Sequence, residues 1–379
     1  IELIRGLAKQ FNLFADVDDG AGLAAFGDAL QQLFADGKLH ATSITVTYYN
    51  KDGTKFGDFT YTATSVTFAN VKVKGKDGSY IYIGGTVQSS KGTRLALADI
   101  KLVKSIAIKY NLTAGADGSV TADMIAFGNE ILGMFEAGKF NSTSLSVTFY
   151  NGDGSIFGIF TFSKAGILGT NVRMWGLNKG SFMMMSFSAK NMQQAAGKID
   201  AIRQAASTLN LATTEGRNEL GKKVFEFLKT QASLTGEEGI ASVGEEITLT
   251  YFNADNTIVG DFTYGFEKIV GKDGVVLTLD VKNVRVDGQN RSYMTTGFSL
   301  RSDQNISTDE MTAKAVQYVE AVKTTGRNYN LFDQSRESTT GMVAFSKDIQ
   351  TQMQPGGALA GLQSLNCSFY NANGTVFEN

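Results

Sequence analysis

The sequence predicts an α+β protein built from tandem repeats of a unit of about 100 residues, which is the size of a small domain. The first observation is a strand-turn-strand phrase that occurs four times, with its turn opening at Asn50, Asn151, Asn253 and Asn371. The second is an Asn-Leu pair that precedes each phrase at a similar distance, at Asn12, Asn111, Asn210 and Asn330. A chain that repeats one scaffold usually works through length, spacing or multivalency.

These anchors divide the chain into four predicted repeats. Repeat 1 covers 1–94, repeat 2 covers 95–190, repeat 3 covers 191–304, and repeat 4 covers 305–379 and is incomplete. Each repeat is far longer than the units of a solenoid. We therefore expect self-contained small domains joined end to end rather than one continuous superhelix.

Each repeat begins with two predicted helices. The first ends at the Asn-Leu anchor, and its apolar residues recur at offsets of three and four, as in Ile100, Val103 and Ile106. Repeat 4 has Thr325 and Gly326 at matching positions, so its first helix is predicted to be the weakest. A second amphipathic segment follows in each repeat, for example at 23–34 and 122–135.

Four predicted strands complete the repeat. The first alternates apolar and polar residues over 44–49, as a half-buried strand does, and the Asp52-Gly53 pair suits a tight hairpin turn. The second strand follows at 56–61, and the third opens at Asn70, Asn171 or Asn283. A Gly turn then leads to a fourth strand that starts with an aromatic residue. We expect two helices on one face of a four-stranded antiparallel meander.

Repeat 3 is longer than the others between its second and third strands. The added residues predict an extended hairpin near 265–282, with Lys272 and Asp273 close to its tip. These two residues are candidate contacts for a binding partner. A tolerated surface insertion is the alternative, because hairpin tips accept extra residues easily.

Repeat 4 stops within its second strand, which leaves half of a predicted sheet. Its unpaired edge, with Val376 and Phe377, is a candidate assembly edge. Either the chain is an excerpt from a longer array, which we favour, or another subunit donates the missing strands. Both alternatives predict self-association or contact with neighbouring copies.

Composition and charge exclude several classes of protein. Hydrophobic residues make up 42% of the chain and charged residues 19%, which is typical of a folded protein. The net charge of −2 and the lack of a basic stripe argue against nucleic-acid binding. No apolar run is long enough to predict a membrane-spanning helix.

Reactive residues do not recur in the repeats, and we predict no catalytic residue and no metal ligand. The single histidine, His40, aligns with Asn141, so this position does not require an imidazole. We expect no cofactor. Structural calcium at the acidic loop 16–20 remains a weak alternative, because the loop lacks the terminal glutamate of a calcium-binding loop.

Trp175 is the strongest candidate for a binding residue. It aligns with Lys74 on the open face of the third strand, where an aromatic ring can stack on a sugar or on a neighbouring subunit. The alternative is that an adjoining domain covers it.

Together these patterns favour a non-enzymatic structural repeat protein that self-assembles in an extracellular filament, a surface layer or a virion appendage. An adhesin is the alternative, with exposed sheet faces that bind a glycan or a protein receptor. Both classes place the protein outside the cell or on the surface of a cell or virion. An enzyme is the third choice.

Overall fold

The computed structural model describes residues 1–234, 246–268, 275–302, 307–333 and 340–377. Within these residues the chain forms eight α-helices: α1 (Glu2–Ala8), α2 (Ala21–Ala35), α3 (Gly92–Ala107), α4 (Ala122–Glu136), α5 (Met192–Ala206), α6 (Thr214–Leu234), α7 (Thr308–Gly326) and α8 (Thr340–Gln352). Short 3-10 turns lie at Asp18–Gly20, Lys76–Gly78, Leu177–Lys179 and Gln289–Arg291.

The strands follow the helices in groups. They are β1 (Ile44–Tyr49), β2 (Lys55–Tyr61), β3 (Val66–Lys74), β4 (Tyr80–Val87), β5 (Ser144–Tyr150), β6 (Ile156–Ser163), β7 (Gly166–Trp175), β8 (Phe182–Ala189), β9 (Ile247–Phe252), β10 (Ile258–Lys268), β11 (Val275–Asp287), β12 (Tyr293–Arg301), β13 (Phe332–Asp333) and β14 (Asn366–Asn371). Their order in the sheet is the chain order up to β12, followed by β14 and β13. The described strands form one antiparallel meander of thirteen strands, and the two-residue β13 is parallel to β14.

The meander does not stop at the fourth strand of each predicted repeat. Strand β4 pairs with β5, β8 pairs with β9, and β12 pairs with β14. The expected series of separate four-stranded sheets is therefore wrong, and a single long meander takes its place. The physical reason is that a fourth strand left at an edge would expose unpaired N–H and C=O groups, which the next first strand satisfies.

The chain divides into two compact units, and each is described by itself. The first comprises Ile1–Val172 and Ser188–Asp200, and the second comprises Arg173–Phe187 and Ala201–Asn379. The boundaries of the four predicted repeats remain a prediction.

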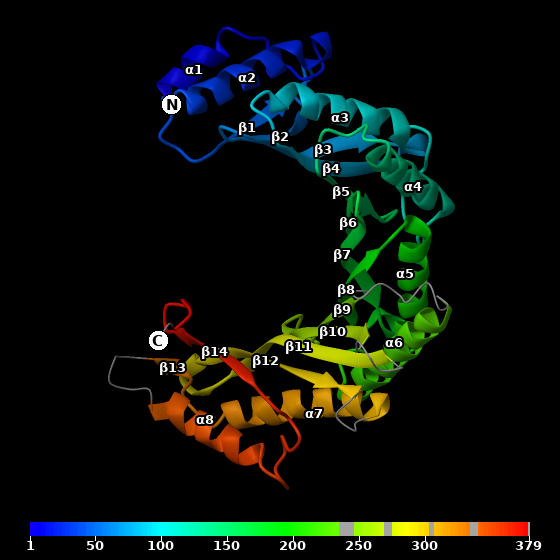
Figure 1. Ribbon diagram of the computed structural model, residues 1–379, viewed down its shortest axis with the longest axis vertical. Coiled ribbons are helices and arrows are strands. Elements are labelled where there is room, and N and C mark those ends of the chain that lie inside the picture. The colour runs from blue at the N-terminus through cyan, green and yellow to red at the C-terminus, as the bar shows by residue number, and fades with distance from the viewer. Residues whose placement is uncertain (235–245, 269–274, 303–306, 334–339, 378–379) are drawn as a thin grey trace. The chain divides into compact units, whose positions relative to one another are not determined.

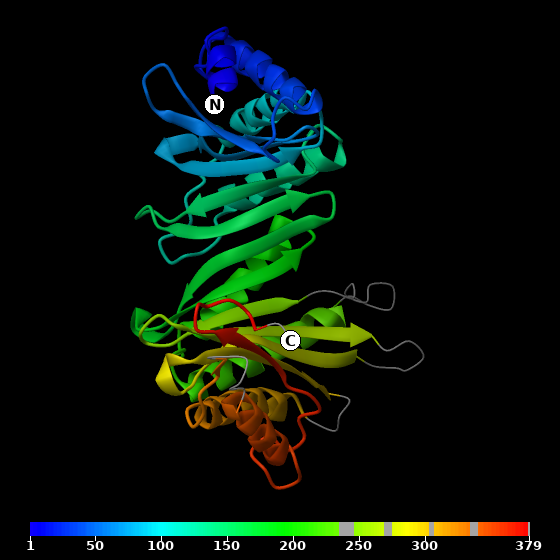
Figure 2. The same cartoon turned by 90° about the vertical axis from the view of Figure 1, so that its left-hand side faces the viewer.

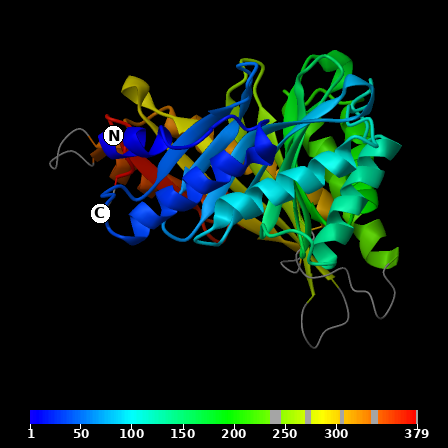
Figure 3. The same ribbon diagram turned by 90° about the horizontal axis from the view of Figure 1, so that it is seen from above.

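In the first compact unit, the helices lie on one face of the strands (Figure 1). Helix α2 contacts β2, whereas α3, which belongs to predicted repeat 2, packs on β3 and β4 of repeat 1. Helices α2 and α3 lie side by side, as the view from above shows (Figure 3). The green strands β5 and β6 have their helix-free face toward the viewer in Figure 2.

The period-two pattern of β3 accounts for this arrangement. Val71 and Val73 are completely buried under the helices, and Lys72 and Lys74 are exposed on the opposite face. Burial of one side chain in two is what a sheet covered on one face requires.

In the second compact unit, α6 packs on β10 and α7 packs on β11 and β12. Helix α7 begins with a capping box between Ser307 and Glu310 and continues for 19 residues. Gly326 allows the close approach of this helix to the sheet, because a Cβ atom there would collide with the side chain of Val286. The small residue that weakens the helix by propensity therefore permits its packing.

The four strand-turn-strand phrases form one recurring turn. In the first, Asn50 Nδ2 donates to Thr54 Oγ1 at 3.0 Å, and Thr54 Oγ1 donates to Asp52 Oδ1 at 2.6 Å. The same bonds recur in the turns that open at Asn151, Asn253 and Asn371. Gly53 supplies the positive φ that the turn needs.

The asparagines that were expected to open the third strands lie inside them. Asn70, Asn171 and Asn283 have φ values of 55°, 54° and 55°. The pairing register shifts around Asn70 and around Asn283, so each occupies a β-bulge. Asparagine tolerates this left-handed conformation better than most residues, which explains why it recurs.

Candidate functional site

Aromatic and cationic side chains gather on the helix-free face where one predicted repeat meets the next. A cation two residues after each bulge asparagine lies over the aromatic residue that opens the following strand. Lys72 Nζ is 4.0 Å from the centre of the Tyr80 ring, and Arg285 Cζ is 4.2 Å from that of Tyr293. A cation placed over a ring face is attracted by the ring quadrupole, so these pairs hold the positive charge against the sheet.

A second ring, from the first strand of the next repeat, completes each cluster. The ring centres are 5.0 Å apart for Tyr80 and Tyr150, 4.6 Å for Phe182 and Phe252, and 4.7 Å for Tyr293 and Tyr370. We call each such set an aromatic-cation cluster. The three sets are Lys72, Tyr80 and Tyr150; Arg173, Phe182 and Phe252; and Arg285, Tyr293 and Tyr370.

Trp175 extends the middle cluster. Its side chain is 40% exposed, its ring centre is 5.7 Å from that of Phe182, and Arg173 Cζ lies 5.5 Å from its ring. The ring therefore lies on the open face of β7, in an aromatic platform beside a guanidinium group. A planar apolar surface next to hydrogen-bond donors can stack on a sugar or accept a protein side chain.

The other predicted contact residues do not join this platform. Lys272 and Asp273 lie outside the described residues. Val376 is 51% exposed and forms an isolated antiparallel bridge with Tyr370, and the Phe377 N–H donates to Phe369 O at 2.8 Å. The segment that carries the predicted assembly edge thus folds back on its own strand.

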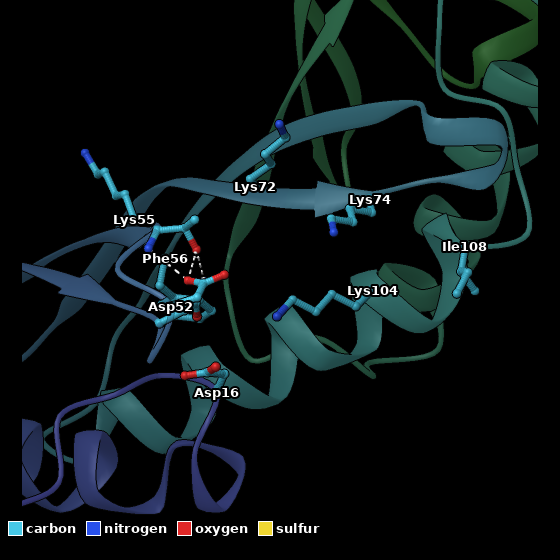
Figure 4. Close-up of a pocket in the computed structure, with 10 residues that line it drawn as sticks. Asp16, Asp52, Lys55, Phe56, Lys72, Lys74, Lys104 and Ile108 are labelled. Carbon is cyan, nitrogen blue, oxygen red and sulfur yellow. Dashed lines mark hydrogen bonds between the residues drawn. The ribbon is translucent and has the colours of Figure 1, made fainter.

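A cavity in the first compact unit has a volume of about 570 Å³ (Figure 4). It is lined by Asp16, Asn50, Asp52, Thr54, Lys55, Phe56, Lys72, Lys74, Lys104 and Ile108. Helix α3 contributes Lys104, whose ammonium lies 5.1 Å from the centre of the Phe56 ring, and burial lowers the pKa of this lysine. Lys55 bonds Asp58 at 2.6 Å, so part of the positive charge is already paired.

A cavity at matching positions in the second compact unit has a different charge. It has a volume of about 360 Å³ and is lined by Asn253, Asp255, Thr257, Ile258, Arg285, Asp287, Glu320, Lys323 and Arg327. Asp287 stands where the first cavity has Lys74, and Asp255 and Glu320 are further carboxylates in the lining. Because the excess of lysine is not kept, the lysine-lined cavity does not represent a recurring anion site.

Buried ionisable groups serve the fold in the described parts of the chain. Asp99 accepts hydrogen bonds from the Ser142 N–H at 2.8 Å and the Ser142 hydroxyl at 2.6 Å, and so ties α3 to the start of β5. Arg217 donates to the carbonyls of Leu211 and Ala212, and burial lowers its pKa. Each group is therefore used in holding elements of the fold together.

The histidine, the cysteine and the acidic loop give no convergent chemistry. His40 is exposed, and the half-buried Cys367 lies 3.6 Å from Thr296 Oγ1, with burial raising its thiol pKa. Asp16 Oδ1 accepts the Lys51 N–H at 2.7 Å. Among the described residues, no three or more His, Cys, Asp or Glu side chains gather as a metal site would require. Structural calcium at 16–20 stays an untested prediction.

Sequence reasoning missed the serine that precedes each cluster. The Leu112 N–H donates to Ser79 Oγ at 3.0 Å, and Leu211 and Leu331 donate in the same way to Ser181 and Ser292 at 2.9 and 2.7 Å. Each Asn-Leu anchor is thereby bonded to the turn between the third and fourth strands of the preceding repeat. The signal was present, because a serine precedes the aromatic residue at each of these positions.

No protein-family model, curated protein or solved structure matches this chain. In the described part of the chain, no helix combines the length and the apolar character needed to cross a membrane.

Proposed function

We propose that the chain is a non-enzymatic structural protein, an array of one repeated module that serves as a building element of an extracellular filament, a surface layer or a virion appendage. We call the pairing between the fourth strand of one predicted repeat and the first strand of the next a joint. The observation that carries the proposal is that the described joints share the same register. Opposite residues at the three joints are Ile83 and Val147, Met185 and Leu249, and Thr296 and Cys367.

These pairs occupy the same position of the module each time. The first member is the third residue after the aromatic residue that opens the fourth strand, and the second is the third residue of the next strand-turn-strand phrase. The serine bond to the Asn-Leu anchor accompanies the strand pairing at every joint. A joint that keeps its register and its bonds suits a protein whose task is to add modules at a constant spacing.

The recurrent polar groups in the described residues are used within the joints and turns. Catalysis needs groups that converge on a reacting atom, with pKa values matched to proton transfer. Among the residues that the structure describes, no convergent set of this kind recurs, which favours a structural role over an enzymatic one.

The test is to locate the protein on native material. Antibodies raised against the 379-residue chain are used in negative-stain immunoelectron microscopy of the cells or particles that produce it. The proposal expects label at regular intervals along a filament, lattice or appendage. Label confined to the cell interior, or dispersed with no ordered structure, would contradict it.

We keep an adhesin as the second candidate, because the platform of Trp175, Phe182 and Arg173 favours it. The experiment is a glycan array with purified protein and a Trp175→Ala variant. Loss of a reproducible glycan signal in this variant supports the adhesin. Leu168→Ala is the matched control, since this side chain is 50% exposed on the same strand and lies outside the platform. No signal with the parent protein would reject glycan binding.

A further inference from the structure

Strand β1 lacks the neighbour that its counterparts have. Strands β5, β9 and β14 each pair on one side with a fourth strand, whereas β1 is the end of the described sheet. Apart from an isolated parallel bridge between Phe14 and Tyr49, β1 pairs with β2 alone among the described strands. Val147 and Leu249 are completely buried, whereas Val46 at the matching position of β1 is half-buried, as is Cys367 in β14 near the other end of the sheet. The outer edge of β1 therefore offers the unpaired backbone groups that the other first strands have satisfied.

Tyr49 lacks the ring that its counterparts stack on. Tyr150, Phe252 and Tyr370 each pack against the aromatic residue that opens a fourth strand. Tyr49 is 49% exposed, and no ring of the described residues is paired with it. Its backbone is nevertheless held in place, because the Ala15 N–H donates to Tyr49 O at 3.1 Å.

The Asn-Leu anchor of repeat 1 is incomplete in the same way. Leu112, Leu211 and Leu331 are completely buried, and each donates its N–H to a turn serine. Leu13 is half-buried, and no described serine accepts its N–H. The same three interactions are thus missing together: the strand edge, the stacked ring and the serine.

Helix α1 is uncovered along the stripe that α3 buries. No residue of α1 is buried: Ile1, just before the helix, is 88% exposed, and Ile4 and Leu7, which continue the same stripe, are half-buried. In α3 the matching stripe of Ile100, Val103 and Ile106 is buried. Exposed apolar side chains together with unpaired backbone groups are typical of an interaction site. We define the docking face as α1, Leu13, β1 and Tyr49.

We propose that the docking face binds the hairpin of third and fourth strands of one further repeat of the same kind. The inference rests on the proposed function, because it treats the joint as the element that repeats. The fourth strand of the incoming hairpin pairs with β1, so that the third residue after its leading aromatic residue lies opposite Val46. Its turn serine accepts the Leu13 N–H, and its leading ring stacks on Tyr49.

The hairpin must come from a repeat other than those described. The turn serines Ser79, Ser181 and Ser292 are already bonded to Leu112, Leu211 and Leu331. The edges of β4, β8 and β12 are likewise taken by β5, β9 and β14. A hairpin that is free to dock is therefore one that these joints have not used.

The experiment places a second copy of residues 1–99 directly in front of Ile1. This connection reproduces the natural one, in which Asp99 is followed by Ile100, the residue that matches Ile1. Amide hydrogen exchange is then measured in residues 44–49 of the original β1. We expect the outward amides of this strand to exchange at least about tenfold more slowly than in the parent chain, because pairing protects them from solvent.

Two variants of the added copy separate docking from mere attachment. Ser79→Ala with Tyr80→Ala in the copy removes the turn serine and the leading ring, and should return β1 exchange toward the parent rate. Lys76→Ala in the copy is the matched control, because this side chain is exposed in the same turn, and protection should remain. The proposal is overturned if the β1 amides are equally protected with all three versions of the added copy. It is also overturned if the unmodified added copy does not protect them.

A second measurement covers the case in which the extended chain does not fold. A fluorescent peptide of residues 66–87 is titrated into the parent chain, and anisotropy is recorded. Saturable binding that becomes about tenfold weaker when the parent chain carries Tyr49→Ala supports docking. If the peptide does not bind, or binds both chains equally, the result counts against docking. Failure of docking is distinguishable from failure of the proposed function, because ordered labelling of native material can occur with β1 unprotected, and β1 can be protected without such labelling.

Discussion

Two hairpins of the first compact unit, β1–β2 and β5–β6, share one backbone plan but differ in chemistry. Val46 lies opposite Phe59 in the first and Val147 opposite Phe160 in the second, and both have a register shift before the last residue of the leading strand. The buried pair Tyr48 and Tyr61 is replaced by Phe149 and Phe162 in the second hairpin.

The exposed face differs as well. Asp58 accepts bonds from Thr47 Oγ1, Lys55 Nζ and Asn70 Nδ2 at 2.7, 2.6 and 2.8 Å, whereas Ile159 takes its place in the second hairpin. The comparison indicates that apolar alternation and turn chemistry set the register, and that polar partners can be exchanged.

The strongest test of the shared plan is the core ring of each hairpin. Phe59 and Phe160 are both completely buried, so Phe59→Ala and Phe160→Ala should each lower the free energy of unfolding by about 3–5 kcal/mol. Chemical denaturation measures both. A small loss at Phe160 with a full loss at Phe59 would mean that the two hairpins do not have equivalent cores.

A smaller effect is expected at the tyrosine pair. The hydroxyls of Tyr48 and Tyr61 are 2.8 Å apart and buried, so Tyr61→Phe removes the partner of the Tyr48 hydroxyl and should cost about 1–3 kcal/mol. The double variant Tyr48→Phe with Tyr61→Phe reproduces the pair Phe149 and Phe162. The double variant should lose less unfolding free energy than the sum of the two single changes. The reason is that neither tyrosine hydroxyl is then left buried without the other as its partner. Strict additivity in a double-mutant cycle would reject the coupling.

Asn70 and Asn171, which both have a left-handed backbone, sharpen the comparison further. Glycine keeps the left-handed backbone, so Asn70→Gly loses mainly the bond to Asp58 and should cost about 0.5–1.5 kcal/mol. Asn171→Gly should cost less, because Ile159 offers no carboxylate at the matching position. Thermal unfolding of the two variants decides between them, and a larger loss at Asn171 would show that its side chain has another structural role.

The smallest effect concerns acid sensitivity. Burial raises the pKa of Asp58, but hydrogen bonds from Lys55, Asn70 and Thr47 outweigh it and lower the value to about 2. The pKa of an aspartate carboxyl in an unfolded chain is about 3.9. The bonded carboxylate therefore contributes stability above that value, and the contribution is lost as the pH falls toward 2. Asp58→Asn should reduce the loss of unfolding free energy between pH 6 and pH 2.5. An unchanged pH profile would show that the carboxylate adds nothing.

The sequence predicted much of the local structure. Asn50, Asp52 and Gly53 carry the chemistry of their turn, since side-chain bonds and a positive φ depend on neighbouring residues alone. The exposed Trp175 was predicted because alternation assigns a face to every strand residue. The predicted start of the third strand at Asn70 was wrong, because β3 begins at Val66 and Asn70 lies in a bulge inside it. A bulge depends on pairing with β4, and the residues of one strand do not specify that pairing.

The residues alone determined the repeated phrases, the apolar faces of helices and strands, and the turns that join them, because these follow from side-chain spacing and local backbone preference. Only the tertiary structure decided that β4 continues into β5 and that Ser79 binds the Leu112 N–H. The physical reason is that an edge strand and a buried N–H need partners distant in the chain, and periodicity specifies which face is apolar but not which partner covers it.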